Sequence, residues 1–431
     1  MTPVMAARAR SAAPTPARLV PALVKGVRTP FTKAGTSLAG VGAADLARAA
    51  MLGVLVRTAL DPARLDEVIV GCVAQPADAL NLARVAALRS GIPKHVPALT
   101  VQRNCASGIE AITQAWLRIQ SGQGELYLVG GVESMSSTPM LFPKPATKKF
   151  ASLASGRGLL SKARAVAALR PQDFVPTPAL RLGLSDPVSG LNMGETAEVL
   201  AREFEIGRAA QDAFALRSHV RAAGAEAKRA EEIAPGYDTA HGVAVLRDNG
   251  VRPHQTLEAL GKLRPVFEKE TGTVTAGNSS QITDGAVALL IGTEAAASSL
   301  GLEPLGAIRG FAYAGCDPKR MGLGPVYAIE RLLERLHVTI EDAELVEINE
   351  AFAAQVLAVL RKLKDEGVGE ISDERLNVNG GAIALGHPVG ASGARLVLTA
   401  LKELQRRNAR EALVSLCVGG GQGAALWLER L

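Results

Sequence analysis

The sequence predicts an α/β protein in which helices cover the faces of its sheets. Short apolar runs alternate along the chain with longer segments of helical periodicity, which is typical of that class. Of the 431 residues, 48% are hydrophobic and 21% charged, whereas only 3% are aromatic and 44 are glycine. We therefore expect a core of Ala, Val, Leu and Ile with many close backbone approaches. The length allows two or three core-bearing units.

The first part of the chain sets this pattern. We expect a short strand at 19–24, a helix at 43–60, a buried strand at 67–70 and a further strand at 126–129, which ends in two glycines. The segment 140–268 differs, because it is rich in Lys, Arg and Pro and has few strand signals. Helical patterns at 195–205 and 209–229 indicate an inserted, mostly helical region with loops.

The core resumes after this insertion, with a strand expected at 287–291 and a boundary at 292–304. The last part then repeats the order of the first. Asn104-Cys-Ala-Ser-Gly108 and Val389-Gly-Ala-Ser-Gly393 each begin an amphipathic helix that is followed by a strand and a Gly-Gly pair. This indicates an internal duplication whose two halves pack together with a site between them.

The expected divisions are a disordered tail at 1–18, a first half at 19–296 that includes the insertion at about 140–268, and a second half at 302–431. The tail is rich in Ala, Pro and Arg, and the first acidic residue is Asp45. A mitochondrial transit peptide is the alternative interpretation, since such segments are basic and poor in acidic residues. Its shortness and its prolines favour a disordered tail.

Charge and cysteine usage exclude several classes of protein. The net charge of +6 is spread along the chain, without a basic stripe and interleaved aromatics. We therefore expect an anionic substrate and no binding to nucleic acid. The four cysteines form no Cys-x-x-Cys pair, so neither a zinc site nor a disulfide framework is expected, and a reducing compartment fits. No apolar run is long enough to span a bilayer.

Cys105 is the strongest candidate for a nucleophile. It lies where a polar loop gives way to a helical pattern, and the free N–H groups of a helix N-terminus favour a thiolate. A thiolate can form a covalent acyl intermediate. Buried structural cysteine is the commoner role, but the neighbours Asn104, Ser107 and Gly108 are small and polar.

Two residues of the second half are candidates for proton transfer. His387 lies in Gly386-His-Pro388, where glycine and proline hold a rigid turn, and orientation is what a base needs. Cys417 follows an apolar strand at 412–416 and precedes three glycines, which suits either a core cysteine or an acid/base at the end of the strand.

Three further features are weaker. Asn349, after a strand at 345–348, is expected to cap a helix or to hold a water that donates to an oxyanion. The loop 272–280 has the Gly, Thr, Asn and Ser residues that suit a phosphate-bearing ligand, although it is not a P-loop. Cys72 and Cys316 are interpreted as structural or incidental.

Together these segments resemble the thiolase family, the acetyl-CoA acyltransferases, from about residue 17 to the C-terminus. Six motifs in the family's order carry the resemblance: Asn104-Cys-Ala-Ser-Gly108, Gly130-Gly-Val-Glu-Ser-Met135, Gly272-Thr-Val-Thr-Ala276, Asn349-Glu-Ala-Phe352, Gly386-His-Pro388 and Cys417-Val-Gly-Gly-Gly421. The resemblance implies two duplicated α/β halves in a five-layered αβαβα core, with an inserted loop domain that binds CoA.

The resemblance also implies roles for residues. Cys105 carries the acyl group, His387 activates it, Cys417 is the second acid/base and Asn349 holds an oxyanion-hole water. The backbone N–H groups of Cys105 and Gly419 form the other oxyanion hole. Ser280, Ala276 and Met193 are expected at the CoA site. No metal and no bound cofactor are implied, and CoA acts as a substrate.

The implied reaction is cleavage of a 3-ketoacyl-CoA by CoA, or the reverse Claisen condensation, with ping-pong kinetics. The long basic insertion, with Lys144, Lys148, Lys149, Arg157, Lys162 and Arg164, resembles the thiolase subunit of the fatty-acid-oxidation trifunctional complex. In that branch the loop is linked to longer acyl chains, a partner subunit and membranes. Asn349 departs from that branch, which often has His there. Asn192 departs from short-chain members, which often have His there.

Two alternatives use the same fold, a β-ketoacyl synthase-like condensing enzyme and a catalytically silent lipid-carrier or scaffold subunit. The first would pair its Cys with two His or with a His and an Asn, whereas this chain has Cys417 in a Gly-rich loop. The presence of every expected reactive residue argues against the second. We expect a homodimer or homotetramer in the cytoplasm of a bacterial cell, with the mitochondrial matrix as the alternative, and a possible β-oxidation partner subunit.

Overall fold

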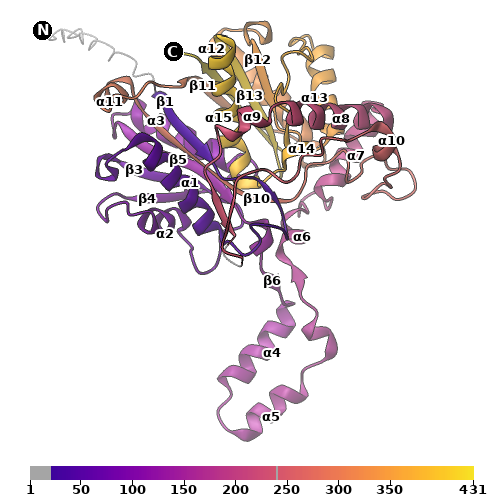
Figure 1. Cartoon of the computed structure of the whole chain (residues 1–431). Coiled ribbons are helices and arrows are strands. Elements are labelled where there is room, and N and C mark those ends of the chain that lie inside the picture. The colour runs from indigo at the N-terminus through magenta and orange to yellow at the C-terminus, as the bar shows by residue number, and fades with distance from the viewer. Residues whose placement is uncertain (1–20, 239–240) are drawn as a thin grey trace, which may run out of the picture.

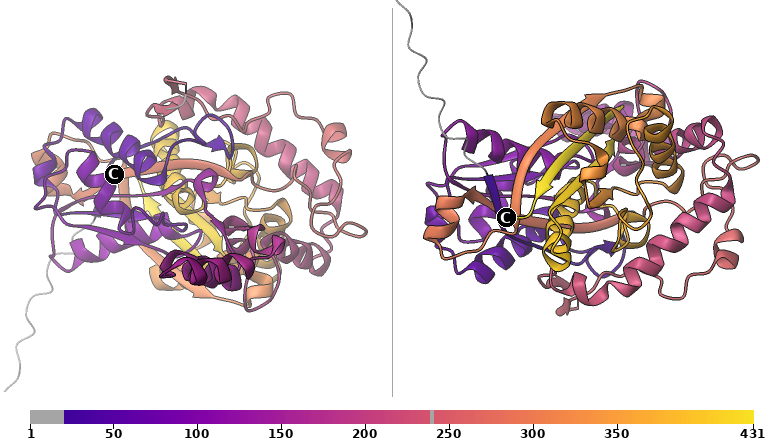
Figure 2. Two further views of the ribbon diagram at one scale, coloured as in Figure 1. Left: turned by 90° about the horizontal axis from the view of Figure 1, so that it is seen from below. Right: turned by 90° about the horizontal axis from the view of Figure 1, so that it is seen from above.

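The computed structural model describes residues 21–238 and 241–431. The tail predicted at 1–18 lies outside the described residues. The chain forms two α/β halves of the same topology and an inserted helical region, part of which extends far from the body of the molecule (Figure 1). Seen from above and below, the N-terminal part of the first half (indigo to purple) and the second half (orange to yellow) lie side by side (Figure 2).

The first half consists of residues before and after the insertion. Its strands and helices are β1 Pro21–Arg28, β2 Thr32–Lys33, α1 Ala43–Thr58, β3 Glu67–Gly71, α2 Leu82–Arg89, β4 Ala98–Val101, α3 Ser107–Gln120, β5 Leu126–Glu133, β10 Thr283–Thr293 and α11 Glu294–Ser299. The strand expected at 19–24 corresponds to β1, which ends four residues later than expected. Residues 19 and 20 lie outside the described residues. The predicted strand at 126–129 extends to Glu133 and therefore includes both glycines.

The second half is formed by the last part of the chain. Its elements are β11 Gly306–Gly315, α12 Gly324–Leu336, β12 Leu345–Ile348, α13 Ala353–Asp365, α14 Ala382–Leu385, α15 Val389–Arg407, β13 Glu411–Val418 and β14 Gln422–Glu429. The strand predicted at 345–348 is confirmed without a shift. The strand predicted at 412–416 extends to Val418, so Cys417 belongs to the strand itself and not to the loop after it.

The pairing of strands repeats in the two halves. In the first, β5 pairs with β3 in parallel and with β10 in antiparallel orientation, and β10 pairs with β1. In the second, β13 pairs with β12 in parallel and with β14 in antiparallel orientation, and β14 pairs with β11. A short contact between β1 and β11, at Ala22–Ala307 and Leu23–Gly306, joins both sets into one mixed sheet. The predicted duplication is confirmed by this shared topology.

Three hydrophobic clusters define five layers. Helices α1 and α2 cover the outer face of the first half's strands, and α12 and α13 cover the outer face of the second half's. Helices α3 and α15 lie between the two sets of strands, where Ile109, Ile112, Leu396 and Leu398 are fully buried. The αβαβα order expected from the resemblance is therefore present. It places the N-termini of α3 and α15 next to each other at the centre of the molecule.

The insertion is mostly helical, as predicted. Its elements are β6 Met140–Leu141, α4 Lys144–Ser155, α5 Leu159–Ala167, β7 Thr177–Pro178, α6 Ala179–Gly183, α7 Met193–Glu203, α8 Arg208–Gly224, α9 Glu226–Ala230, β8 Gly236–Asp238, β9 Val243–Val245 and α10 Leu257–Gly261. The helix expected at 209–229 is interrupted at Ala225, which separates α8 from α9. Helices α7 and α8 pack on α13 and α14 of the second half.

Residues 140–178, called the arm below, project from the body as a pair of helices on a short β6–β7 ribbon (Figure 1). Phe142, Phe150 and Phe174 pack edge to face within the arm, with ring centroids 5.3 and 5.7 Å apart. At its tip Leu159 and Leu160 are 91% and 69% exposed. The arm therefore has a small core of its own and large unburied apolar side chains. No helix in the described parts of the chain is long and apolar enough to cross a membrane.

Candidate active site

The two Ala-Ser-Gly turns bring the candidate nucleophile and the candidate base together. Helices α3 and α15 cross at Gly108 and Gly393: a Cβ on Gly108 would lie 2.8 Å from the backbone N of Ala394 and 2.9 Å from the carbonyl O of Gly390. Only glycine allows this approach, since the neighbouring atoms belong to backbone. Cys105 and His387 each lie two residues before one of these helices.

The turn that carries Cys105 is fixed by short hydrogen bonds. Asn104 has a positive φ of 42°, which its side chain makes tolerable by local hydrogen bonding. Its Nδ2 donates to the carbonyl O of Gly419 over 2.8 Å, which links the turn to the Gly-rich loop of the other half. The Ser107 hydroxyl donates to the carbonyl O of Asn104 over 2.7 Å and accepts the N–H of Arg103 over 2.9 Å.

The Cys105 sulfur meets two backbone donors. Burial raises the pKa of its thiol, and hydrogen bonds from the N–H groups of Gly419 and of Cys105 itself act in the opposite direction. Burial is the larger effect, so the resting group is a thiol. The thiolate expected from the helix N-terminus is therefore wrong for the resting state, because α3 begins two residues later and the half-buried sulfur loses hydration. A base must remove the proton.

His387 is positioned to be that base. Its backbone N–H donates to the carbonyl O of Gln281 over 3.0 Å, and its ring is buried. Nδ1 lies 2.6 Å from the Ser392 hydroxyl, and Nε2 lies 3.4 Å from Nδ2 of Asn349. Burial, and then the positive charge of Arg395, lower the pKa of His387 to about 4. The imidazole is thus neutral at pH 7 and able to accept a proton.

Asn349 does not cap a helix, so that part of the expectation is wrong. Helix α13 begins four residues later at Ala353, after the extended N-cap residue Phe352. Asn349 lies instead at the end of β12, where its N–H donates to the carbonyl O of Ser415 over 3.0 Å. Its side chain is fully buried, and among the described residues its Oδ1 has no hydrogen-bond partner. A buried carbonyl oxygen of this kind is suited to hold a water or a ligand.

Cys417 is the second thiol of the site. It is 1% exposed and faces Gly423 across the β13–β14 pair. Burial, and then the nearby Cys105, raise its pKa well above the ordinary value. It is therefore a protonated thiol at neutral pH, which fits a group that must first give a proton away. Cys316 lies outside this pocket, and Cys72 is buried with its Sγ 3.8 Å from Glu133.

One pocket of about 1000 Å³ connects these groups. Its walls include Cys105, His387, Cys417 and Gly419, and also the predicted ligand residues Met193, Ala276 and Ser280. Asn349 is in contact with the pocket through His387. The remaining walls include apolar side chains from the insertion, such as Leu180, Leu184 and Phe267, and from both halves, such as Met135, Ile282 and Phe352. Lys33, Arg181 and Arg252 give the pocket three cationic side chains.

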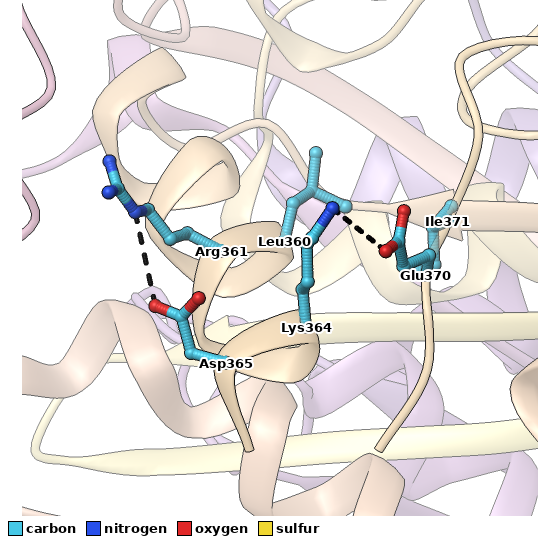
Figure 3. A pocket seen from close by; sticks show the side chains of 6 residues that line it. All are labelled: Leu360, Arg361, Lys364, Asp365, Glu370 and Ile371. Atoms are coloured by element: carbon cyan, nitrogen blue, oxygen red, sulfur yellow. Dashed lines mark ion pairs between the residues drawn. The ribbon is translucent and has the colours of Figure 1, made fainter. Parts of the chain in front are cut away.

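A second depression, of about 440 Å³, lies on α13 away from these residues (Figure 3). Its charged side chains pair with one another, Lys364 with Glu370 over 2.8 Å and Arg361 with Asp365 over 3.9 Å. These pairs are largely exposed and hold no reactive group, so we assign no site there. Among residues 21–238 and 241–431, no three His, Cys, Asp or Glu side chains gather as they would around a metal ion.

Three supporting residues were not predicted to have a role. From the sequence, Asn104 and Ser392 were treated only as parts of motifs, and Glu133 was given no role beyond its place in Gly130-Gly-Val-Glu-Ser-Met135. Glu133 is 1% exposed and accepts the backbone N–H groups of Val73, Ala74 and Gly390. The signal that could have found Ser392 was the repeated Ala-Ser-Gly turn, in which the serine stands at the same place in both halves.

The chain is similar to proteins of one family over nearly its whole length. The family profile "Thiolase, N-terminal domain" matches residues 21–295, and "Thiolase, C-terminal domain" matches residues 302–430. The beta-ketoadipyl-CoA thiolase of Pseudomonas knackmussii is 44% identical over 94% of this chain and 98% of its own length. The 3-ketoacyl-CoA thiolase of Pseudoalteromonas translucida is 42% identical over 95% and 99%. The crystal structure of human mitochondrial 3-ketoacyl-CoA thiolase in complex with CoA matches with a TM-score of 0.85, at 38% identity over 96% and 98%.

Proposed function

The chain belongs to the thiolase family and is an acyl-CoA thiolase, and we propose that it cleaves 3-ketoacyl-CoA with CoA by way of an acyl group carried on Cys105. The observation that carries this proposal is the arrangement of a thiol, a neutral imidazole and a second thiol around one pocket. Two such acid/base groups suit a reaction that breaks a carbon–carbon bond and forms a thioester. The comparisons do not favour a β-ketoacyl synthase or a silent scaffold subunit.

The first half-reaction uses all three groups. His387 takes the Cys105 proton on Nε2, and the sulfur's electron pair attacks the 3-keto carbon. The bond between C2 and C3 then breaks, and its electron pair forms the enolate of acetyl-CoA. Cys417 protonates that carbon and acetyl-CoA leaves, while the shortened acyl group remains on Cys105 as a thioester.

The second half-reaction restores the enzyme. The Cys417 thiolate takes the proton of an incoming CoA thiol, and the CoA sulfur attacks the acyl carbon. The Cys105 thiolate that leaves regains the proton held by His387. Protons and electron pairs balance with CoA as the only further reactant.

Negative charge develops on oxygen at two positions in this cycle, and we propose a pair of donors for each. The N–H groups of Cys105 and Gly419, which meet at the sulfur, are proposed to hold the oxygen of the acyl group. The Nε2–H of protonated His387, with a water on Asn349, is proposed to hold the enolate oxygen. Each such donor is worth about 3–4 kcal/mol of barrier in other acyl-transfer enzymes.

The CoA portion is proposed to lie along Met193, Ala276 and Ser280, since these residues line the pocket beside the thiols. The sulfur of Met193 comes within 3.3 Å of a Cβ placed on Gly419, so this side of the pocket is narrow. The cationic side chains that line the pocket suit the phosphates of CoA.

The identity of the acyl chain on the 3-ketoacyl-CoA substrate is a separate proposal. The apolar side chains of Leu180 and Leu184, which follow the arm, favour a 3-ketoacyl chain longer than acetoacetyl. A 3-ketoacyl-CoA that ends in a carboxylate is the second candidate, because Lys33, Arg181 and Arg252 line the same pocket and several relatives are named beta-ketoadipyl-CoA thiolase. Acetyl-CoA acetyltransferase activity alone is the least favoured choice.

Partners and location remain proposals as well. We expect a homodimer or homotetramer, and the exposed cationic arm suits contact with a β-oxidation partner subunit that presents an acidic face. The branch resemblance to the trifunctional complex and the cytoplasmic location stay predictions.

Thiolysis assays test the function directly. Purified enzyme would be given acetoacetyl-CoA, 3-ketoadipyl-CoA and 3-ketoacyl-CoA of medium and long chain, and the loss of ketoacyl absorbance followed on addition of CoA. We expect kcat/KM to rise with an apolar chain and to fall to background in Cys105→Ala. A preference for 3-ketoadipyl-CoA would select the second candidate. Absence of turnover with every substrate, from an enzyme whose Cys105 still reacts with iodoacetamide, would reject the proposed activity.

A further inference from the structure

The ring of His387 has one hydrogen-bonding contact at each nitrogen. Nδ1 lies 2.6 Å from the hydroxyl oxygen of Ser392, and Nε2 lies 3.4 Å from the amide nitrogen of Asn349. All three side chains are buried, with exposed fractions of 9% or less. A neutral imidazole carries its proton on one nitrogen only, and the hydrogen bond at one nitrogen determines what the other can do.

The Ser392 hydroxyl has two neighbours that compete for its single proton. It lies 3.0 Å from the carbonyl O of Pro388, which can only accept, and 2.6 Å from Nδ1, which can accept or donate. If the hydroxyl donates to the carbonyl, its oxygen is free to accept the proton of an Nδ1–H. Both contacts are then satisfied. If it donated to Nδ1, the carbonyl contact would carry no proton.

The related serine of the first half has the same two kinds of contact without that ambiguity. Ser107 donates to the carbonyl O of Asn104 and accepts the backbone N–H of Arg103, and neither backbone group can reverse its role. Ser107 and Ser392 stand at the same position of the repeated Ala-Ser-Gly turn, at the first turns of α3 and α15. The repeat therefore favours a hydroxyl that donates to a carbonyl and accepts an N–H in both halves.

We propose that Ser392 is a positioning residue that holds His387 in the Nδ1–H form, so that the lone pair of Nε2 points into the pocket, as its twin Ser107 holds the turn of Cys105. The amide of Asn349 on the Nε2 side is consistent with a lone pair there. This inference rests on the proposed role of His387 as the base for Cys105.

The arrangement has a consequence for the order of events. While His387 is neutral, Nε2 can accept a proton but cannot donate a hydrogen bond to a substrate oxygen. It becomes a donor only after it has taken the proton of Cys105. Transfer of this proton thus first frees the Cys105 thiolate, and the proton then stabilises the oxyanion. The Nε2–H donor of His387 does not exist before the thiolate has formed.

Nitrogen NMR of ¹⁵N-histidine-labelled enzyme tests the tautomer directly. The six histidines of the chain are labelled together, and the signals of His387 are identified by their absence in His387→Gln. We expect a protonated Nδ1 and an unprotonated Nε2 in the wild type at pH 7. In Ser392→Ala these signals should move toward a mixture of both tautomers, whereas Ser392→Thr, which keeps the hydroxyl, should restore the wild-type pattern.

Two further variants separate positioning from folding. Ser107→Ala removes the twin hydroxyl and should leave the His387 signals unchanged. Ser90→Ala removes a buried hydroxyl that donates to the carbonyl O of Ala86 in α2, far from the pocket, and should change neither the signals nor activity. The wild-type spectrum keeps the test decisive even if one substitution prevents folding.

The rate of Cys105 alkylation by iodoacetamide gives the functional readout. Ser392→Ala should slow it at pH 7 by at least about tenfold and lower kcat similarly, with KM within twofold, because a misdirected base is lost but the pocket is not. An unprotonated Nδ1 in the wild type, or an unchanged tautomer and alkylation rate in Ser392→Ala, would overturn the proposal. Neither the NMR spectrum nor the alkylation rate needs an acyl-CoA, so failure of the proposed thiolysis is seen separately, as wild-type enzyme without turnover.

Discussion

Glu133, the last residue of β5 in the first half, accepts the backbone N–H of Gly390 in the first turn of α15 over 3.0 Å. The same carboxylate accepts N–H groups from Val73 and Ala74 in the loop after β3. One buried side chain therefore ties a loop of the first half to the helix of the second half that follows His387. Burial raises the pKa of Glu133, and these three N–H groups act against that rise.

Replacement of Glu133 is expected to damage both stability and the site. In Glu133→Ala three N–H groups lose their acceptor, and the one that is fully buried, on Gly390, costs about 1–3 kcal/mol when it is left unsatisfied. The start of α15 should then shift and move His387, so alkylation of Cys105 should slow together with the loss in stability. Denaturant unfolding and alkylation kinetics measure the two effects. Glu133→Gln keeps one acceptor oxygen and should fall between Ala and wild type.

Glu403 provides the matched control on the same helix. It is buried near the C-terminal end of α15 and binds Lys228, Asn379 and Arg407. Glu403→Gln should lower the free energy of unfolding without changing the reactivity of Cys105. Equal effects of the two variants on alkylation would mean that Glu133 acts only through global stability.

Gly108→Ala should separate the two helices that carry the site. The new methyl group would lie within 3.0 Å of the backbone of Gly390 and Ala394, and backbone atoms cannot yield as a flexible side chain can. We expect a loss of about 1–3 kcal/mol from overpacking and a fall in kcat, measured by thermal unfolding and thiolysis. Gly224→Ala in α8, where nothing lies within 4 Å of the new Cβ, should be neutral or slightly stabilising. A fully active Gly108→Ala would show that this close approach is not needed.

The repeated halves could be predicted because their signals are local. The Ala-Ser-Gly turns at Ser107 and Ser392 specify two helix starts with small residues, and small residues at a helix start permit close packing. The alternation of strands and helices follows in the same way from periodicity. What these patterns do not contain is the distance between elements, so the contact between Glu133 and Gly390 was invisible in the sequence.

The errors have the same physical origin. Asn349 was expected to cap a helix because Asn favours that position, yet four residues separate the end of β12 from the start of α13. Cys105 was expected to rest as a thiolate because a helix end favours charge, yet burial is a tertiary property and outweighs it. The mostly helical character of the insertion was predicted, but the projection of the arm was not, because helical periodicity does not tell what an apolar face contacts.

Cys417→Ala should separate the two halves of the reaction. An activated aryl ester whose leaving group needs no proton should still acylate Cys105, so a burst of that leaving group should remain. Thiolysis of 3-ketoacyl-CoA should fall by about 10²–10⁴-fold, the usual contribution of a general acid/base. Cys316→Ala, a matched change outside the pocket, should leave both activities intact. Equal loss of the burst and of thiolysis in Cys417→Ala would contradict a role confined to proton transfer.

Removal of the arm should leave the catalytic body intact. Residues 144–173 contain seven Lys and Arg and one acidic residue, Asp173, so their net charge equals the +6 of the whole chain. Their apolar contacts are mostly internal, and Ala146 is the buried hydrophobic residue of α4. A short Gly-Ser linker in place of 144–176 should keep the melting temperature within about 2 °C and acetoacetyl-CoA thiolysis within twofold.

The shortened chain should no longer associate with an acidic partner subunit. Sizing chromatography with an acidic partner subunit would show a complex with the full chain at low salt and none with the shortened one. A variant with the same arm but with Lys148 and Lys162 changed to Glu would separate charge from shape. Loss of cooperative unfolding in the shortened chain would instead mean that the arm belongs to the core.

The pH dependence of Cys105 reactivity should depend on a buried ion pair behind His387. Arg395 binds Glu347 over 3.1 Å, and both side chains are nearly inaccessible. After burial, the Arg395 charge is the second cause that lowers the pKa of His387 to about 4. Nε2 therefore keeps its lone pair down to about pH 4, whereas an ordinary histidine would lose it near pH 6.5. Alkylation of the wild-type enzyme should remain base-assisted at pH 5.5.

Replacing both members of the pair tests whether the Arg395 charge lowers the pKa of His387. In Glu347→Gln/Arg395→Met the cation is absent, so the pKa of His387 should rise toward 6.5 but stop short of it, because burial remains. Between the two pKa values His387 is then protonated, and alkylation at pH 5 should be slower than in the wild type, with equal rates at pH 8. Arg395→Met alone would leave Glu347 buried and unpaired, which costs about 3–5 kcal/mol and confuses the comparison. Arg309→Met, which breaks a half-exposed pair with Glu411, is the control that should not shift the profile. If the double variant keeps the wild-type acid limb, the charge of Arg395 does not act on His387, and burial alone sets its protonation.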